Sequence, residues 1–516
     1  MPKLLSALQD WRARPSAVLP LAFLQALVVG LDSLPVTYIL REIRCDEYRA
    51  TMAPHIPEDD VCRAPEVQAA YSTDLAVFAT ILAVLSVVLS GPYGRLSDTR
   101  GRKRALTVAV ALNLLGDVWF TLCAFLPPLR KPVFFHLGAA LQGLGGGFSV
   151  VLAGQNALIA DTSAPHERSF YMGLALVMWW SGTAVGPLLS GVLVEGRLYT
   201  LAFALCVLLW ALYLPYVAFV VREARDSEAE ACTAAPSDAA AAATDEAPPR
   251  QSLASRLRDG LRMVLEPMII LVQHLPLLLL SISMAGTVLA VGVFGWVIPY
   301  CDVKFGLPAW EAGIVTASWS IARAVSVMFL LPVFLTAYQW LTARKKSQTQ
   351  PVPAPDPNTA RASETTPLLA EAAQQNSESA SQLDASSLSQ ELTIVRVCLV
   401  LDAIGMFAIE RSRNTGEVIL AAIVSSFGAP AGPSMQALLT LAAPPGEVGR
   451  VLAGLSILQS AAAAVRGPIF APLFNATIEK APGAIWWVAA GILLLCSSVA
   501  FALNPRQFFL VHERQA

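Results

Sequence analysis

Long apolar runs dominate this sequence, and short polar or charged segments separate them. Most runs approach or exceed the roughly 20 residues that a helix needs to cross the hydrocarbon core of a bilayer, and they lack the alternation of barrel strands. A backbone in lipid must satisfy its own hydrogen bonds, so the pattern predicts an all-α fold with membrane-spanning helices. The expected spans are residues 18–40, 71–89, 106–125, 133–160, 171–193, 199–221, 277–300, 312–335, 394–409, 418–441, 451–474 and 485–503.

Composition agrees with a lipid environment. Hydrophobic residues make up 55% of the chain and charged residues 14%, and the mean hydropathy is +0.56. These values are unusual for a protein whose whole surface meets water. The formal net charge of −2 says little about partners. We expect the lipid bilayer as a partner, no nucleic acid, and a monomer.

The distribution of lysine and arginine predicts the orientation. Positive residues gather before the first span and between the second and third, and such short basic segments stay in the cytoplasm. With an even number of spans, both termini are expected on the cytoplasmic side. Four arginines in the first outer loop oppose this assignment, but neighbouring acids neutralise them. The basic residues that set the orientation are Lys3, Arg12, Arg14, Arg95, Arg100, Arg102, Lys103 and Arg104.

Two polar segments divide the chain. Residues 223–250 are rich in small and acidic residues and predict a linker between two six-span halves. The expected organisation is an N-terminal bundle (1–222), a cytoplasmic linker in which an amphipathic helix begins (223–262) and a C-terminal bundle (263–516). Within the last, the composition of residues 345–390 predicts a disordered cytoplasmic loop, which contains the acidic-dileucine pattern ETTPLL.

The two halves are related to each other in sequence. A Gly-Pro pair stands at the same offset in the fifth and eleventh expected spans, at Gly186-Pro187 and Gly467-Pro468. Such a repeat predicts two pseudo-symmetric bundles related by an axis along the membrane normal, which is the plan of a large class of transporters.

The segment GRLSDTRGRKR, residues 94–104, lies between the second and third spans. It resembles the loop signature of the major facilitator superfamily. The resemblance implies a conformational latch in which Asp98 sits against the amino terminus of the eleventh span, near Gly449 and Arg450, where a helix dipole favours a carboxylate. The alternative is that the arginines only hold the loop in the cytosol. The latch residues are Gly94, Asp98, Gly101, Arg102 and Arg104.

A second signature occupies the fifth span. Gly182, Gly186, Pro187 and Gly191 resemble the motif of the drug:proton antiporter branch, in which small residues let helices pack closely around a kink. Plain helix packing is the alternative. Ala139 replaces the arginine that this branch tends to carry in its fourth span, which argues against drug export.

The cysteines point toward another subgroup. Cys45, Cys62 and Cys301 fall in outer loops, where disulfides persist. Their positions resemble those of the proton-coupled folate transporter group and fungal facilitators similar to it. Cys45 can pair with Cys62 or a bridge can reach Cys301, and one cysteine stays free or pairs elsewhere. No metal-ligand spacing is visible.

Charges inside the spans are costly and therefore mark candidate proton or substrate sites. Asp32 is the best proton or cation site by analogy with the cavity-lining first span, and its alternative is a structural hydrogen bond near Pro35. Arg466 can hold an anion or pair with Asp402 or Asp32. The full set of candidates is Asp32, Gln155, Asn156, Arg323, Asp402, Gln436 and Arg466. Asp117 is also intramembrane, and Trp179 and Trp180 offer flat apolar walls.

Together these features predict a secondary transporter that moves a small solute by alternating access, with proton coupling as an option. No phosphate-binding loop, serine elbow or paired-histidine metal motif is present in the sequence, so we expect neither an enzyme nor a cofactor. The alternative function is a non-transporting receptor on the same fold. The plasma membrane and the vacuolar or lysosomal membrane are the expected locations.

Overall fold

Helices account for the architecture of the protein. The computed structural model describes residues 15–52, 61–163, 168–221, 268–330, 332–334, 336–338, 340, 368–443 and 447–504. Within these ranges no strand occurs, and 12 helical stretches are long and apolar enough to cross a membrane, as the sequence predicts. The expected linker, residues 223–262, lies outside the described residues.

The N-terminal half contains six of these stretches. Its elements are η1 (Pro15–Val18), α2 (Leu19–Met52), α4 (Pro65–Arg100), α5 (Arg102–Phe125), η2 (Pro127–Leu129), α6 (Pro132–Leu144), α7 (Gly147–Thr162), α8 (Arg168–Glu195) and α9 (Tyr199–Phe219). Prolines at the start of α4 and α6 suit the first helical turn, where the missing N–H has no partner to lose.

The C-terminal half repeats the arrangement. Its elements are α12 (Leu275–Val291), η3 (Gly292–Trp296), α13 (Val297–Phe305), α14 (Ala309–Val325), η4 (Ser326–Leu330), α16 (Leu368–Arg411), α17 (Thr415–Ser426), α18 (Ala431–Ala442), α19 (Val448–Thr477) and α20 (Ala484–Ala502). The side chain of Asn414 caps α17 by accepting a hydrogen bond from the backbone N–H of Glu417 at 2.9 Å.

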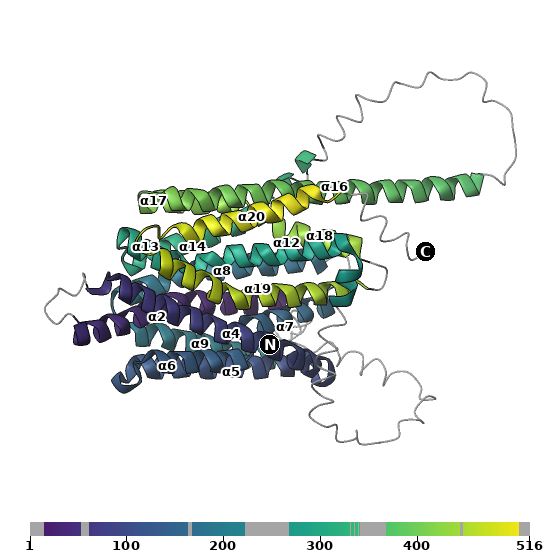
Figure 1. Ribbon diagram of the computed structural model, residues 1–516. Coiled ribbons are helices and arrows are strands. Elements are labelled where there is room, and N and C mark those ends of the chain that lie inside the picture. Colours follow the sequence, from purple (N-terminus) through teal and green to yellow (C-terminus); the bar gives the residue numbers. More distant parts are fainter. Residues whose placement is uncertain are drawn as a thin grey trace, which may run out of the picture.

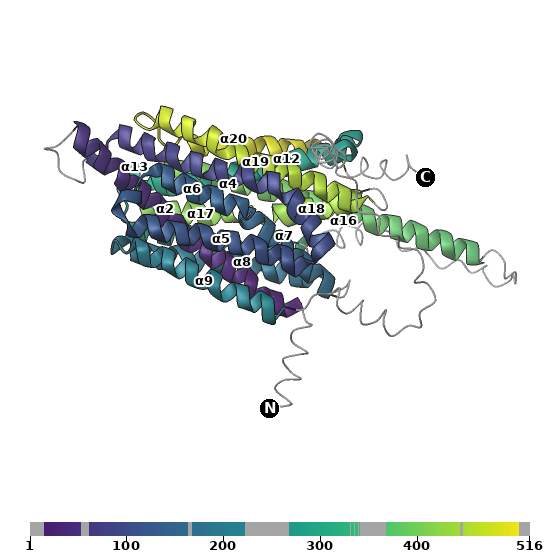
Figure 2. The ribbon, with the colours of Figure 1, turned by 90° about the horizontal axis from the view of Figure 1, so that it is seen from below.

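The helices run roughly parallel, with the two halves side by side. In Figure 1 the N-terminal helices α5, α6 and α9 form one side of the molecule, and the C-terminal helices α16, α17 and α20 form the other; Figure 2 shows the same bundle turned by 90°. Two helix pairs join the halves, because α8 packs against α14 and α4 packs against α19. These pairs are equivalent in the repeat, since α8 and α19 carry the two Gly-Pro pairs.

The fourth and tenth spans are broken, where the sequence predicts continuous helices. Between α6 and α7, Gly146 and Gly147 have φ angles of +75° and +55°, which only glycine adopts readily. Between α17 and α18 the chain turns at residues 427–430, just before a helix that starts after Pro430. Runs of glycine, alanine and proline at membrane depth are tolerated here because the breaks pack against neighbouring helices.

The helix that contains the ninth span begins earlier than the sequence predicts. Helix α16 starts at Leu368 and continues to Arg411, so the expected disorder is wrong for residues 368–390. Alanine, glutamine, glutamate and leucine are frequent in this stretch, and these residues favour helices. Extending an existing helix also avoids the cost of nucleation. The remainder of the expected loop, through residue 367, lies outside the described residues.

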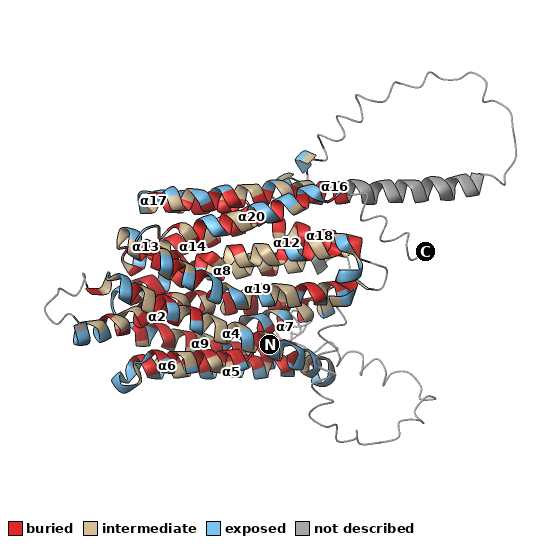
Figure 3. Cartoon of the chain, in the orientation of Figure 1, coloured by how far each residue is buried: buried red, intermediate tan, exposed pale blue. Residues whose placement is uncertain are grey.

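Apolar residues cover both the interior and the outward surface. Phe470, Trp486 and Phe203 are fully buried among the helices, whereas Leu495 and Val88 are 68% and 63% exposed. Figure 3 shows exposed positions along the outer helices of the bundle. Exposed apolar side chains at this density fit a lipid surrounding, and the protein is a multi-pass integral membrane protein.

Candidate functional site

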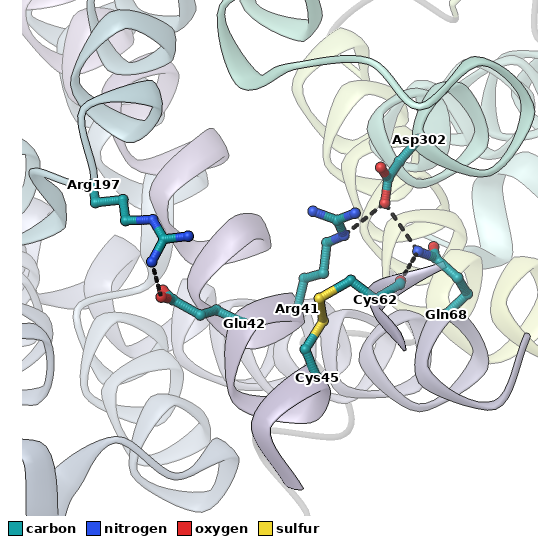
Figure 4. The surroundings of a disulfide bond; sticks show 7 residues. All are labelled: Arg41, Glu42, Cys45, Cys62, Gln68, Arg197 and Asp302. Atoms are coloured by element: carbon teal, nitrogen blue, oxygen red, sulfur yellow. Dashed lines mark hydrogen bonds and ion pairs between the residues drawn. A yellow bond between two sulfur atoms is a disulfide. The ribbon is translucent and has the colours of Figure 1, made fainter. Parts of the chain in front are cut away.

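Asp302 joins the two halves at one end of the bundle. It lies near the end of α13, and its Oδ2 is 2.7 Å from Nε of Arg41 on α2. The same oxygen accepts a hydrogen bond from Nε2 of Gln68 on α4 at 2.9 Å. The Asp302 side chain is only 5% exposed, so two N-terminal helices neutralise and shield one C-terminal carboxylate (Figure 4).

A disulfide supports this contact. Cys45 pairs with Cys62, which settles the alternatives left open by the sequence, and Cys301 is a buried free cysteine. Nε2 of Gln68 also donates to the carbonyl oxygen of Cys62 at 2.8 Å, so the bridged segment holds the amide that contacts Asp302. We call this end of the bundle the disulfide end.

Further contacts close the disulfide end. Glu195 at the end of α8 accepts a hydrogen bond from the backbone N–H of Ala309 at the start of α14, at 3.0 Å. On the other helix pair, Asn475 of α19 donates a hydrogen bond to Oγ1 of Thr73 on α4 at 2.8 Å. Its Oδ1 accepts a hydrogen bond from the hydroxyl of Ser72. Each of the two helix pairs is therefore fastened by polar groups near this end.

Small residues bring the helices of the disulfide end together. Gly191 and the backbone of Ala309 and Trp310 are so close that a Cβ at Gly191 would lie 3.1 Å from their atoms. In the equivalent pair, a Cβ added to Gly467 would lie 2.7 Å from Oγ1 of Thr80 and 2.9 Å from the carbonyl oxygen of Ala76. The fifth-span motif therefore serves helix packing, with Pro187 inside the continuous helix α8.

The opposite end of the bundle carries residues 94–104, and we call it the motif end. A Cβ added to Gly94 on α4, Gly173 on α8 or Gly449 on α19 would meet no atom of a described residue within 4 Å. No described residue therefore packs on Gly94 from the Cβ direction. Arg450 forms an ion pair with Glu447 at 3.1 Å. The Asp98 side chain lies outside the described residues, so the latch stays a prediction.

The rest of the loop motif organises the N-terminal half. Gly101 separates α4 from α5 with a φ of 100°, which explains the glycine. Nε of Arg102 lies 3.2 Å from Oδ2 of Asp161 on α7. Nζ of Lys103 donates to the carbonyl of Val221 after α9, at 3.0 Å. Arg104 is exposed. The basic loop therefore ties together several helices of its own half.

Two carboxyl groups interact electrostatically inside the N-terminal half. Asp117 on α5 is fully buried and accepts hydrogen bonds from Nε1 of Trp210 at 2.7 Å and Nε2 of Gln142 at 2.8 Å. Asp32 on α2 interacts electrostatically with Asp117 and with the Gln142 amide. Asp32 is partly accessible, and its Oδ1 has no hydrogen-bond partner. Two carboxyl groups so placed favour sharing a proton over carrying two charges.

The amide candidates are not brought together. Gln155 is buried and donates from Nε2 to the Tyr213 hydroxyl at 2.8 Å, which gives it a structural partner in the N-terminal half. Asn156 is partly buried beside it on α7, and Gln436 on α18 is exposed.

A buried arginine lies where the halves meet. The guanidinium carbon of Arg323 on α14 is 5.4 Å from the ring centre of Trp180 on α8 and 5.0 Å from that of Trp319. Phe294 stacks on Trp319 with ring centres 4.0 Å apart. Arg323 is 7% exposed, yet its Nε and Nη1 have no hydrogen-bond partner.

Asp402 on α16 is the acidic neighbour of Arg323. The two interact electrostatically but form no ion pair among the described residues. Oδ1 of Asp402 accepts a hydrogen bond from Ser425 at 2.6 Å, and its Oδ2 has no partner. Gly428, in the break of the tenth span, packs directly on this carboxylate.

Arg466 on α19 stands apart from both acids. The described residues include no carboxylate at ion-pair distance from it, so the alternative in which Arg466 pairs with Asp402 or Asp32 is not present. Its stem packs against Gly292 at the break of the seventh span, and its Nε is buried without a hydrogen-bond partner.

Sequence reasoning missed several residues of these clusters. Gln142, Trp210 and Trp319 contact the candidate charges, and Asp302 joins the halves. The spacing of Trp319 and Arg323, four residues apart on one helix, is a usable signal. Asp302 follows Cys301 directly at the end of a span, but nothing in the sequence indicates its partners.

Comparisons with known proteins agree with the fold. The family model of the Major Facilitator Superfamily matches residues 63–343. An uncharacterised membrane protein of Schizosaccharomyces pombe is 26% identical over 95% of this chain and 79% of its own length.

Solved structures resemble the whole chain. The human organic anion transporter MFSD10 has a TM-score of 0.58 at 14% identity, covering 95% of this chain and 99% of its own. A D-xylose-proton symporter has a TM-score of 0.60 at 13% identity, covering 95% and 98%. At such identities these likenesses establish only the fold, whereas the match to the family model shows the family to which the chain belongs. The chain belongs to the major facilitator superfamily and is a membrane transporter of that family, not an enzyme.

Proposed function

We propose that the protein carries a small solute across its membrane by alternating access, driven by protons. The contrast between the two ends is the observation that carries this proposal. At the disulfide end, glycines and polar side chains hold the halves in direct contact, whereas a Cβ added to Gly94, Gly173 or Gly449 at the motif end would meet no neighbour within 4 Å among the described residues. A carrier closed on one side and open on the other presents this asymmetry.

The motif end is assigned to the cytoplasm. Arg95, Arg100, Arg102, Lys103 and Arg104 lie there, which fits the preference of basic segments for that side. The disulfide lies at the opposite end, where an oxidising environment preserves it. Under this assignment, we propose that the carrier is open to the cytoplasm in this conformation and that both termini lie on that side.

Asp32 is proposed as the proton-carrying group. It is the partly accessible member of the acid pair, while Asp117 is held by Trp210 and Gln142. Protonation of Asp32 removes its repulsion with Asp117 and the cost of a charge at membrane depth. The similar fold of a proton symporter supports this coupling as a proposal for this chain.

Cross-linking of the motif end tests alternating access without knowledge of the solute. Gly94→Cys and Gly449→Cys are combined in a background in which Cys232 is replaced by serine. The cysteines described elsewhere are buried or bridged. A short bismaleimide is expected to join the two positions slowly in the resting protein. When the pH is lowered, the cross-linking rate should rise relative to the rate at which each single cysteine reacts with N-ethylmaleimide at the same pH, which corrects for the smaller thiolate fraction.

A solute screen then tests transport itself. Thermal shift of the purified protein identifies binders, because a ligand of the folded state raises the melting temperature. Uptake of a binder into proteoliposomes is expected to follow an imposed pH gradient. Binding without uptake, together with an absence of cross-linking changes, would instead support the receptor alternative.

A further inference from the structure

Arg323 is an unusual arginine for a membrane helix. It lies on α14 at membrane depth, in contact with Trp180 of the other half, and is almost completely buried. Nε and Nη1 nevertheless lack acceptors. Buried guanidinium groups normally have their donors satisfied, because an unmet charged donor in a low-dielectric surrounding is costly.

The neighbouring acid does not satisfy these donors. Asp402 interacts with Arg323 electrostatically, but its own Oδ2 is also without a hydrogen-bond partner. If Arg323 and Asp402 formed a structural ion pair, their charged groups would be in direct contact. Ser425 and Gly428 hold the carboxylate where it is, so Asp402 offsets part of the charge and leaves the Arg323 donors free.

The C-terminal half holds a second buried guanidinium, away from the Arg323 cluster. Arg466 on α19 adds a second guanidinium whose Nε is buried without a partner. Its electrostatic environment includes no acidic neighbour among the described residues, unlike that of Arg323. At Arg323, Nε and Nη1 are free donors that an anion can satisfy and a cation cannot.

The tryptophans add a flat apolar wall. Trp180 and Trp319 meet edge to face, with ring centres 5.7 Å apart, and contribute surfaces from opposite halves. Trp180 is only partly buried, so part of its surface remains available beside the guanidinium. Such an arrangement suits a molecule with an anionic group and an aromatic or otherwise flat body.

We propose that Arg323 is the anion-binding residue of the transport site, and that the solute is an organic anion whose carboxylate accepts from Arg323 while its flat body lies against Trp180. This inference rests on the proposed transport function and narrows its substrate class. Because Trp180 and Arg323 belong to different halves, the bound solute contacts both halves. Its binding free energy therefore depends on how the halves are arranged.

Calorimetric titration of the full-length protein in detergent tests the site. The probes are 2-naphthoate and its neutral counterpart 2-naphthamide, with benzoate as a smaller anion. We expect 2-naphthoate to bind at least about tenfold more tightly than 2-naphthamide, since a charge-assisted contact distinguishes them. Equal affinities for acid and amide, or an absence of binding by both aryl carboxylates, would overturn the proposal.

Variants separate an anion site from a structural role. Arg323→Gln is expected to weaken 2-naphthoate binding at least about tenfold, whereas Arg411→Gln, which alters an 85% exposed arginine, leaves it unchanged. Asp402→Asn is expected to strengthen binding roughly threefold by removing a nearby negative charge. This gain distinguishes the proposal from loss of folding. Unchanged binding in Arg323→Gln, or weaker binding in Asp402→Asn, would refute it.

The two proposals fail in different ways. If acid-stimulated cross-linking at the motif end occurs but no aryl carboxylate binds, the carrier mechanism stands and the anion site is wrong. If 2-naphthoate binds through Arg323 but neither cross-linking nor uptake is seen, the anion site stands and transport is wrong.

Discussion

Asp32 and Asp117 have identical side chains but different surroundings. Asp117 receives hydrogen bonds from an indole and an amide, while Asp32 keeps an oxygen without a partner and remains partly accessible. The first is fixed in place, whereas the free oxygen and the partial accessibility of the second support the proton-carrying role proposed for it. Their chemical difference arises from the neighbouring helices and not from the residue type.

Neutral substitutions should separate these tasks. Asp32→Asn is expected to abolish the stimulation of uptake by a pH gradient while leaving solute exchange at equal pH intact. Asp117→Asn is expected to lower the free energy of unfolding by about 1–3 kcal/mol, because the amide cannot accept from both Trp210 and Gln142 as the carboxylate does. Proteoliposome uptake and thermal unfolding measure the two effects. Retained pH dependence in Asp32→Asn would remove this residue from the coupling role.

The sequence reveals charges in the membrane but not their partners. Asp32, Arg323 and Arg466 could be predicted as special because each is costly in an apolar span. Gln142, Trp210 and Trp180 become partners only through the packing of helices that lie far apart in the chain. For the same reason the expected pairing of Arg466 with an acid did not follow from the presence of both residue types.

At the scale of helices, the small residues of α8 carry a precise packing role. A Cβ at Gly186 would lie 2.6 Å from the backbone of Gly30 on α2, whereas a Cβ at Gly173 on the same helix would meet nothing. Gly186→Ala is therefore expected to lower the free energy of unfolding by about 1–3 kcal/mol through overpacking. Gly173→Ala is the matched control, and it should leave thermal stability unchanged or slightly raised. Similar melting temperatures for the two variants would contradict this packing role.

Span positions follow from the sequence, but span interiors do not. Length and hydropathy placed all twelve candidate spans, since lipid imposes one solution on an isolated backbone. The breaks at Gly146–Gly147 and before Pro430 depend on tertiary packing that compensates the lost hydrogen bonds. The extension of α16 to Leu368 was missed because a polar composition was read as disorder although its residues are good helix formers.

At the scale of the molecule, the Cys45–Cys62 bridge stabilises the closed disulfide end. The cysteines are 17 residues apart, and closing a loop of this length is expected to contribute about 3 kcal/mol. Cys45→Ser with Cys62→Ser should lower the melting temperature and should abolish its sensitivity to a reducing agent. The wild type, by contrast, should lose stability on reduction. If reduction shifts the variant and the wild type equally, the effect arises elsewhere.

Asp302 is expected to govern which end of the carrier is open. The halves of a facilitator move as units, so loosening the disulfide end must favour closure of the motif end. Asp302→Asn removes the charge that Arg41 pairs with and weakens the contact to Gln68. Cross-linking between Gly94→Cys and Gly449→Cys should then become several-fold faster. Glu47→Gln is the control, because Glu47 pairs with Arg44 at the same end without joining the halves. A faster reaction in the control, or an unchanged rate in Asp302→Asn, would show that the Asp302 contact does not hold the disulfide end closed.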